Sequence, residues 1–268
     1  MSHTSAIRRK TIKDIMKAKG HHKLVCLTAY TAPIAQMLDE HCDLLLVGDS
    51  VGMVLHGLPD TTAVTLDMMI MHGKAVMRGS QNALVVVDMP FGSFEESPQA
   101  AYRNALRVMQ ETGCQAVKLE YNSAAPETIR FLVDRGIPVV AHIGLRPQYL
   151  HVEGGYKVAG KNEESRQEQL ECARQVAEAG AFCVVVEGTK DEVAREISDS
   201  VPIPTIGIGA SVDCDGQILV TDDMLGMFDK TPKFVRKYAE LKSQIELGVK
   251  AFANDVRREQ FPAADETY

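Results

Sequence analysis

Short apolar runs that each end in one polar residue recur along the chain. Five of them are Leu44–Gly48 before Asp49, Ala83–Val87 before Asp88, Ala116–Leu119 before Glu120, Val139–Ala141 before His142 and Cys183–Val186 before Glu187. Continuous β-branched runs of this length are typical of parallel strands that are buried on both faces. We therefore expect the four acids and the histidine at the carboxyl ends of parallel strands, where α/β folds bind their ligands.

Segments with helical spacing alternate with these runs. Ala101, Ala105 and Val108 fall on one face of a helix that begins at Ser97-Pro98 and runs to Gly113. Further helices are predicted over about 11–19, 33–40, 65–78, 125–136, 163–179 and 191–200 and in much of the chain up to 256, and further strands over 24–27, 203–206 and 216–220. Alternating strands and helices indicate βαβ units and a parallel sheet.

Eight such strands predict a single (β/α)8 TIM barrel over residues 1–268, with a short N-terminal helix and a helical C-terminal extension. The length of 268 residues is close to the roughly 250 that this fold takes. The segment 207–215 is too short for a full helix, so the barrel is expected to close irregularly there. An open doubly wound sheet is the alternative, but acids from four strands converge more readily in a circular arrangement.

Composition and charge exclude several classes of protein. The net charge of −7 and the lack of a basic block argue against nucleic-acid binding. No apolar run approaches the ~18 residues of a membrane span, and no hydrophobic signal segment is seen at the N-terminus. The six cysteines are scattered without a CxxC pair. The expected location is therefore the cytoplasm.

Three of the acids form a candidate metal site. Asp49, Asp88 and Glu120 would offer only oxygen atoms at the mouth of the barrel, and such a set suits Mg²⁺ better than zinc. Each acid alone is more simply explained as a cap of the following helix or as the partner of a nearby Lys or Arg. Convergence of all three favours the metal.

The remaining polar residues suggest substrate chemistry. Lys118 and Glu120 lie on the same face of one strand. Lys118 is open to three roles, as a Schiff-base nucleophile, as a clamp on a substrate oxygen or as the partner of an inward acid, and we favour the clamp. Glu187 suits a general base, with a fourth metal ligand or a helix cap as alternatives. His142 either orients a substrate or an acid, or is a satisfied core histidine.

Six short motifs, taken together, resemble those of the ketopantoate hydroxymethyltransferase family. They are Gly48-Asp49-Ser50, Asp88-Met89-Pro90-Phe91, Val117-Lys118-Leu119-Glu120, Gly154-Gly155-Tyr156-Lys157-Val158, Gly207-Ile208-Gly209-Ala210 and Asp215-Gly216-Gln217-Ile218-Leu219-Val220. They occur in the family's order and span about residues 24–228. Each is weak alone, and six in order make a specific match.

The resemblance implies a barrel of the phosphoenolpyruvate/pyruvate superfamily type, commonly assembled as a homodecamer of two five-membered rings. It implies transfer of a hydroxymethyl group from 5,10-methylenetetrahydrofolate to 3-methyl-2-oxobutanoate, which gives 2-dehydropantoate for pantothenate synthesis. The family's Mg²⁺ ligands fall on Asp49, Asp88 and Glu120, and its general base falls on Glu187. Its contacts to the oxo acid fall on Asp49, Ser50, Asp88 and Lys118.

Two other functions compete with this one. A lyase or mutase that acts on an oxo-acid enolate would share the barrel and the Mg²⁺ acids, but it is expected to carry a cysteine in a gating loop. Cys214 comes closest to such a position, and it precedes the last strand rather than following one. A barrel that only binds an oxo acid, as a sensor or scaffold, would not need Lys118, Glu187 and all three metal acids.

Overall fold

The computed structural model describes residues 8–268, which form two compact units. The first unit extends to Leu219 and holds eight parallel strands that close into a barrel in the order β1 to β8. The strands are β1 Leu24–Thr28, β2 Leu44–Val47, β3 Leu84–Asp88, β4 Ala116–Glu120, β5 Val139–Gly144, β6 Cys183–Glu187, β7 Thr205–Ile208 and β8 Gly216–Leu219. The predicted (β/α)8 barrel is confirmed.

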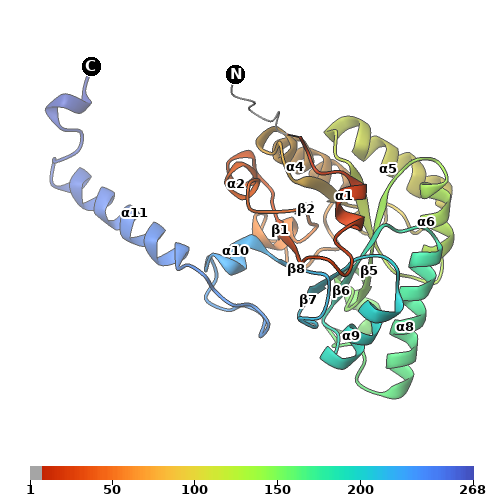
Figure 1. Ribbon diagram of the computed structural model, residues 1–268. Helices are drawn as coiled ribbons and strands as arrows, with labels where there is room; N and C mark the ends of the chain where they lie inside the picture. Colours follow the sequence, from red (N-terminus) through yellow and green to blue (C-terminus); the bar gives the residue numbers. More distant parts are fainter. Residues whose placement is uncertain (1–7) are drawn as a thin grey trace, which may run out of the picture. The chain divides into compact units, whose positions relative to one another are not determined.

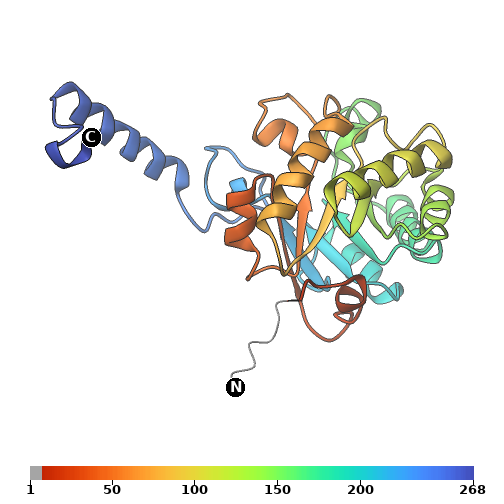
Figure 2. The ribbon, with the colours of Figure 1, turned by 90° about the horizontal axis from the view of Figure 1, so that it is seen from above.

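Most of the helices flank the strands on the outside of the barrel (Figures 1 and 2), while Ile15 of the first helix packs with residues inside it. In the first unit they are α1 Ile12–Met16, α2 Ala32–Leu38, α3 Val51–Val54, α4 Leu66–Gly79, α5 Pro98–Thr112, α6 Ala125–Val133, α7 Leu150–Glu153, α8 Glu163–Glu178 and α9 Asp191–Ser200, with the 3-10 turn η1 Pro147–Tyr149. The side chains of Thr65 and Ser97 accept hydrogen bonds at the starts of α4 and α5, and Gly113 ends α5 in the left-handed region.

Three local expectations needed correction. The segment predicted as a strand over 203–206 pairs instead from Thr205, because Pro202 and Pro204 have no N–H to donate. The loop after β2 contains the short helix α3, and the long loop after β5 contains η1 and α7. A fourth expectation is confirmed, because no helix lies between β7 and β8.

Alternate residues of each strand pack into two separate hydrophobic clusters. One lies inside the barrel and includes Leu44, Leu46, Leu84 and Val86. The other, which includes Leu45, Val47, Val85 and Val87, lies between the strands and the surrounding helices. Both faces of β2 to β6 are covered, so these strands are apolar except at their carboxyl ends, whereas Val25 of β1 and Gln217 of β8 are exposed on the outer face.

The second unit, Val220–Tyr268, contains the short helix α10 Thr221–Met224, the long helix α11 Leu241–Arg257 and the turn η2 Ala264–Glu266. None of the residues of α11 is buried. Its apolar residues Ile245, Val249, Phe252 and Val256 recur at helical spacing and are all exposed. No helix within residues 8–268 has both the length and the hydropathy to cross a membrane.

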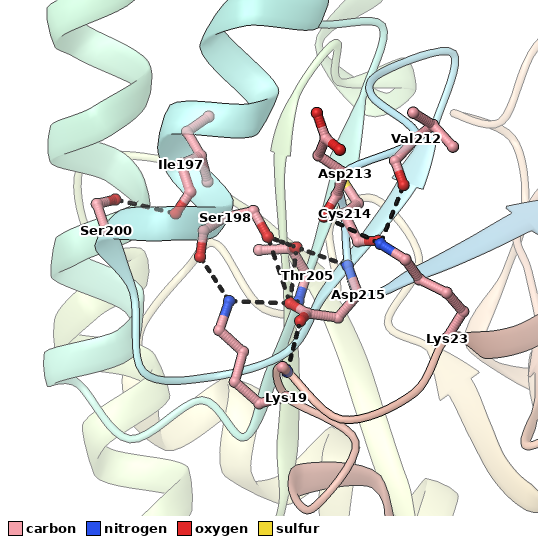
Figure 3. A network of polar contacts seen from close by, with 11 residues as sticks. Lys19, Lys23, Ile197, Ser198, Ser200, Thr205, Val212, Asp213, Cys214 and Asp215 are labelled. Atoms are coloured by element: carbon pink, nitrogen blue, oxygen red, sulfur yellow. Dashed lines mark hydrogen bonds and ion pairs between the residues drawn. The ribbon is translucent and has the colours of Figure 1, made fainter.

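The amino-terminal face of the barrel is held by a network around Asp215 (Figure 3). Asp215 precedes β8 and accepts hydrogen bonds from the backbone N–H of Thr205 at 2.9 Å and from the Lys19 ammonium at 2.9 Å. The Lys23 ammonium donates to three successive carbonyl groups, those of Val212, Asp213 and Cys214. The network ties the segment after α1 to the irregular connection between β7 and β8.

Candidate active site

The alternation that builds the core also directs five polar side chains into the barrel. Asp88 is in phase with the interior residues Leu84 and Val86, and Glu187 is in phase with Cys183 and Val185. Lys118 and Glu120 follow Ala116, and His142 follows Val140, with the same spacing of two. The predicted site residues on β3, β4, β5 and β6 therefore lie inside the carboxyl end of one barrel.

Strand register sets which of these residues meet. Asp88 is the register partner of Lys118 across β3 and β4, and the Lys118 Nζ lies 2.8 Å from the Asp88 Oδ1. Glu120 is the register partner of His142 across β4 and β5, with 3.6 Å between Glu120 Oε1 and His142 Nδ1. The other ring nitrogen of His142, Nε2, lies 3.2 Å from Glu187 Oε2. His142 thus stands between two carboxylates.

Close approach of β5 and β6 depends on a glycine beside the catalytic candidates. Gly144 is the register partner of Glu187 and has a φ of 91°. A Cβ atom at position 144 would lie 2.1 Å from the backbone oxygen of Glu187. Only glycine fits there without displacing the strand that carries Glu187.

Asp49 and Ser50 lie just beyond the end of β2. The Asp49 backbone N–H donates to Asp88 Oδ2 at 3.1 Å, which links the ends of β2 and β3. The Ser50 hydroxyl lies 2.8 Å from the Tyr30 hydroxyl. The Gln148 side-chain amide donates to Asp49 Oδ2 at 2.8 Å. Of the proposed site residues, Asp49, Asp88, Lys118, Glu120 and His142 are all buried, while Ser50 and Glu187 are partly exposed.

These acids do not act as helix caps. The residues at the N-caps of the following helices are Ser50 for α3, Ser97 for α5, Ala124 for α6 and Lys190 for α9. Helix capping is therefore excluded for Asp49, Asp88, Glu120 and Glu187, whereas pairing with a lysine does apply to Asp88, which contacts Lys118.

Burial and crowding of like charges perturb ionisation throughout the site. Burial, followed by the charge of Asp88, raises the pKa of Asp49 to about 7. Burial and the charge of Asp49 raise the pKa of Glu120 well above its ordinary value. Burial and the Lys118 ammonium lower the pKa of His142, so its imidazole is neutral at pH 7. The site therefore carries more negative groups than its single cation can balance.

Lys118 is charged rather than nucleophilic. Burial alone would lower the pKa of its ammonium, but the carboxylates of Asp88, Asp49 and Glu120 together raise it above the ordinary value. A Schiff-base lysine requires a neutral amine near pH 7. The structure thus argues against that role and leaves Lys118 as an ion-pair partner or a clamp for an anionic substrate.

The site also fits a divalent cation by its chemistry. No set of three His, Cys, Asp or Glu side chains within residues 8–268 is already arranged to hold a metal ion. Mg²⁺ keeps several waters, however, and is commonly held through one or two carboxylates. Burial and neighbouring carboxylates raise the pKa values of Asp49 and Glu120, and a cation among these oxygens would favour their charged forms.

Gln148 is the site residue that the sequence pattern did not reveal. It lies in η1, within a segment that was expected to be an irregular loop, and it is buried. Neither apolar periodicity nor a strand end marks its position. A polar residue after Pro147, in the loop that follows the His142 strand, was the only local signal.

The chain matches one known protein family over almost its whole length. The family model of ketopantoate hydroxymethyltransferase matches residues 9–264. The chain is 62% identical to a 3-methyl-2-oxobutanoate hydroxymethyltransferase of Phenylobacterium zucineum and 60% identical to one of Caulobacter vibrioides, in each case over 98% of this chain and 95% of the relative.

A solved structure shows the same fold at much lower identity. It is a 2,3-dimethylmalate lyase described as a member of the PEP mutase/isocitrate lyase superfamily, with a TM-score of 0.59 and 15% identity over 96% of this chain and 91% of that one. The two proteins therefore share the (β/α)8 barrel fold. By the extent and identity of the sequence matches, the chain belongs to the ketopantoate hydroxymethyltransferase family.

Proposed function

We propose that this protein transfers a hydroxymethyl group from 5,10-methylenetetrahydrofolate to 3-methyl-2-oxobutanoate, forming 2-dehydropantoate in pantothenate biosynthesis. Membership of the family supports the overall reaction and favours it over the lyase alternative. The observation that carries it in the structure is the set of inward polar residues at one end of the barrel, with excess negative charge beside a buried lysine. Family membership is the support for the folate donor.

Mg²⁺ is the proposed metal, with Asp49, Asp88 and Glu120 as the residues that hold it. Bound there, the ion would polarise the keto oxygen of the oxo acid and stabilise the enolate that forms on loss of the C3 proton. The proposed contacts to the oxo acid come from Asp49, Ser50, Asp88 and Lys118. Lys118 holds a positive charge where the anionic end of the substrate would lie.

Glu187 is the proposed general base. Its carboxylate is partly exposed at the end of β6, so one oxygen can face the substrate while the other lies 3.2 Å from His142 Nε2. Removal of the C3 proton by Glu187 would leave the enolate to attack the one-carbon unit of the folate, and water would supply the hydroxyl group as the bond to tetrahydrofolate breaks. A neutral His142 can donate its N–H to the carboxylate and hold it in one orientation.

Deuterium exchange at C3 of 3-methyl-2-oxobutanoate tests the proposal in two stages. Exchange is measured first with Mg²⁺ and with EDTA in the absence of folate, and methylenetetrahydrofolate is then added. We expect exchange that depends on Mg²⁺ and that turns into ketopantoate formation once the folate is present. Exchange without any turnover on folate addition would instead support a lyase or mutase, and binding of the oxo acid without exchange would support a sensor.

We also propose that the protein forms a homo-oligomer, with a decamer as the state that the family resemblance implies. The apolar stripe of α11, which is exposed within one chain, supports a covering partner copy. Sedimentation analysis of the wild-type protein and of Phe252→Glu would test this. A wild-type protein that sediments as a monomer would contradict the proposal.

The proposed location is the cytoplasm. All six cysteines are buried free thiols. Burial raises the pKa of the Cys42 and Cys172 thiols to about 11, which keeps them protonated and unreactive. A reducing compartment suits a protein of this size that uses no disulfide.

A further inference from the structure

Gln148 connects the ends of three strands. Its side-chain Nε2 donates to Asp49 Oδ2 at 2.8 Å and to the backbone oxygen of Met89 at 3.0 Å. Its backbone N–H points at the Glu120 carboxylate, 3.2 Å from Oε2. Asp49 follows β2, Met89 follows β3 and Glu120 ends β4. One buried residue from the segment after β5 thus contacts two of the proposed metal ligands and the residue next to the third.

The orientation of the Gln148 amide is fixed by its partners. A carboxylate oxygen and a backbone carbonyl oxygen can only accept hydrogen bonds, so the NH₂ group must face both of them. Both of its N–H bonds are then used. The amide oxygen Oε1 is buried and has no hydrogen-bond partner among the described residues. The side chain therefore acts here as a donor toward the acids.

The segment that carries Gln148 has anchors of its own. Arg146 donates to the backbone oxygen of Tyr121 at 3.0 Å and pairs with Glu153 at 2.6 Å. The Arg146 guanidinium also lies over the Tyr149 ring, 4.6 Å from its centroid. These contacts hold the turn without the Gln148 side chain, so that side chain can be changed while the turn stays in place.

We propose that Gln148 is a positioning residue of the active site, which holds the Asp49 carboxylate and the β3 end in the arrangement that binds the divalent ion and the oxo acid. The proposal rests on the proposed function of these acids. An amide suits this place because it donates twice without adding charge to a site that already has excess negative charge. Lysine or arginine there would compete with the metal, and an apolar residue would leave Asp49 without this donor.

The test is the affinity of the full-length protein for Mn²⁺ alone, measured by electron paramagnetic resonance for wild type and Gln148→Met. Methionine has a similar length but donates no hydrogen bond. We expect Mn²⁺ to bind about 10- to 100-fold more weakly to the variant, the range for loss of a group that orients a metal ligand. Gln169→Met is the matched control, because Gln169 is also a buried glutamine but lies on α8. It should bind Mn²⁺ as wild type does.

Equal Mn²⁺ affinity in Gln148→Met and wild type would overturn the proposal, as would an equal loss in Gln169→Met. Should Gln148→Met not fold, Gln148→Leu replaces it, because leucine is also uncharged and cannot donate to either acceptor. C3 proton exchange at saturating Mg²⁺ should then fall at least about 10-fold, and exchange at the wild-type rate would overturn the proposal. A wild-type protein with no Mg²⁺-dependent exchange would instead count against the proposed function.

Discussion

Asp49 and Asp215 are both buried aspartates beside strand ends, yet their pKa values are shifted in opposite directions. Burial opposes ionisation of Asp215, but hydrogen bonds from Thr205 and the Lys19 ammonium outweigh it and lower its pKa (Figure 3). Burial and the charge of Asp88 raise the pKa of Asp49 to about 7. At the amino end of the barrel an acid is neutralised by its own neighbours. At the carboxyl end the acids are left under-neutralised, as a ligand-binding site requires.

The largest effect should come from Glu187, the proposed general base at the carboxyl end of the barrel. Glu187→Gln keeps the shape of the side chain and removes the base, so C3 proton exchange should fall by about 10² to 10⁴. Mg²⁺ and oxo-acid binding should stay near wild type, because Glu187 is not among the proposed ligands. The measurement is deuterium incorporation followed by NMR. Exchange at the original rate would refute Glu187 as the base.

The next largest effect should come from the amino end and should concern stability alone. Asp215→Asn removes the charge that Lys19, Thr205 and Gly20 satisfy, and we expect a loss of about 2 kcal/mol in the free energy of unfolding. Urea denaturation measures this. The rate of C3 proton exchange per folded molecule should be unchanged. A changed Mg²⁺ affinity in Asp215→Asn would show that the amino end also affects the metal site.

The positions of residues on the strands could be predicted from the sequence, whereas those of residues in the loops could not. The apolar runs predicted where the strands lie, and the alternation of side chains along a strand predicted that Lys118 and Glu120 share a face. The fold and the proximity of these two residues could therefore be predicted from the sequence. The end of β2 differs, because Asp49 lies two residues beyond the strand and its direction depends on the turn. Gln148 could not be predicted either, since three long-range contacts define it and none leaves a local pattern.

The two aspartates should also respond to pH with opposite signs. The pKa of Asp49 is higher in the folded protein than the ordinary 3.8, so the metal-free protein loses stability from this group as pH rises from about 4 to about 7. The pKa of Asp215 is lowered, so its contribution is present above its ordinary pKa and is lost as pH falls through the folded value. Urea denaturation of Asp49→Asn and Asp215→Asn across pH 3–8 would separate the contributions of the two aspartates to the free energy of unfolding.

Mg²⁺ binding should follow the same titration of Asp49. A proton must leave Asp49 before the ion binds, and another must leave Glu120, whose pKa is also raised, so affinity should rise as pH increases through about 7, by up to about 10-fold per pH unit for each proton released. Calorimetric titrations in buffers of different ionisation enthalpy would count the released protons. An affinity that is flat between pH 6 and 8 would place the ion away from Asp49.

The smallest effect should come from His142, which is buried and whose two ring nitrogens face carboxylates of the site. Its ring is 3.2 Å from Glu187 and 3.6 Å from Glu120, and a neutral imidazole has one N–H to share between them. His142→Asn keeps a donor but shortens its reach, so kcat for exchange should fall about 10-fold with little change in KM. Because burial and Lys118 lower the pKa of His142, the wild-type rate should show no step from this group between pH 7 and 8. An unchanged kcat in His142→Asn, with a loss of stability alone, would make His142 a core histidine and leave Glu187 oriented by its own strand.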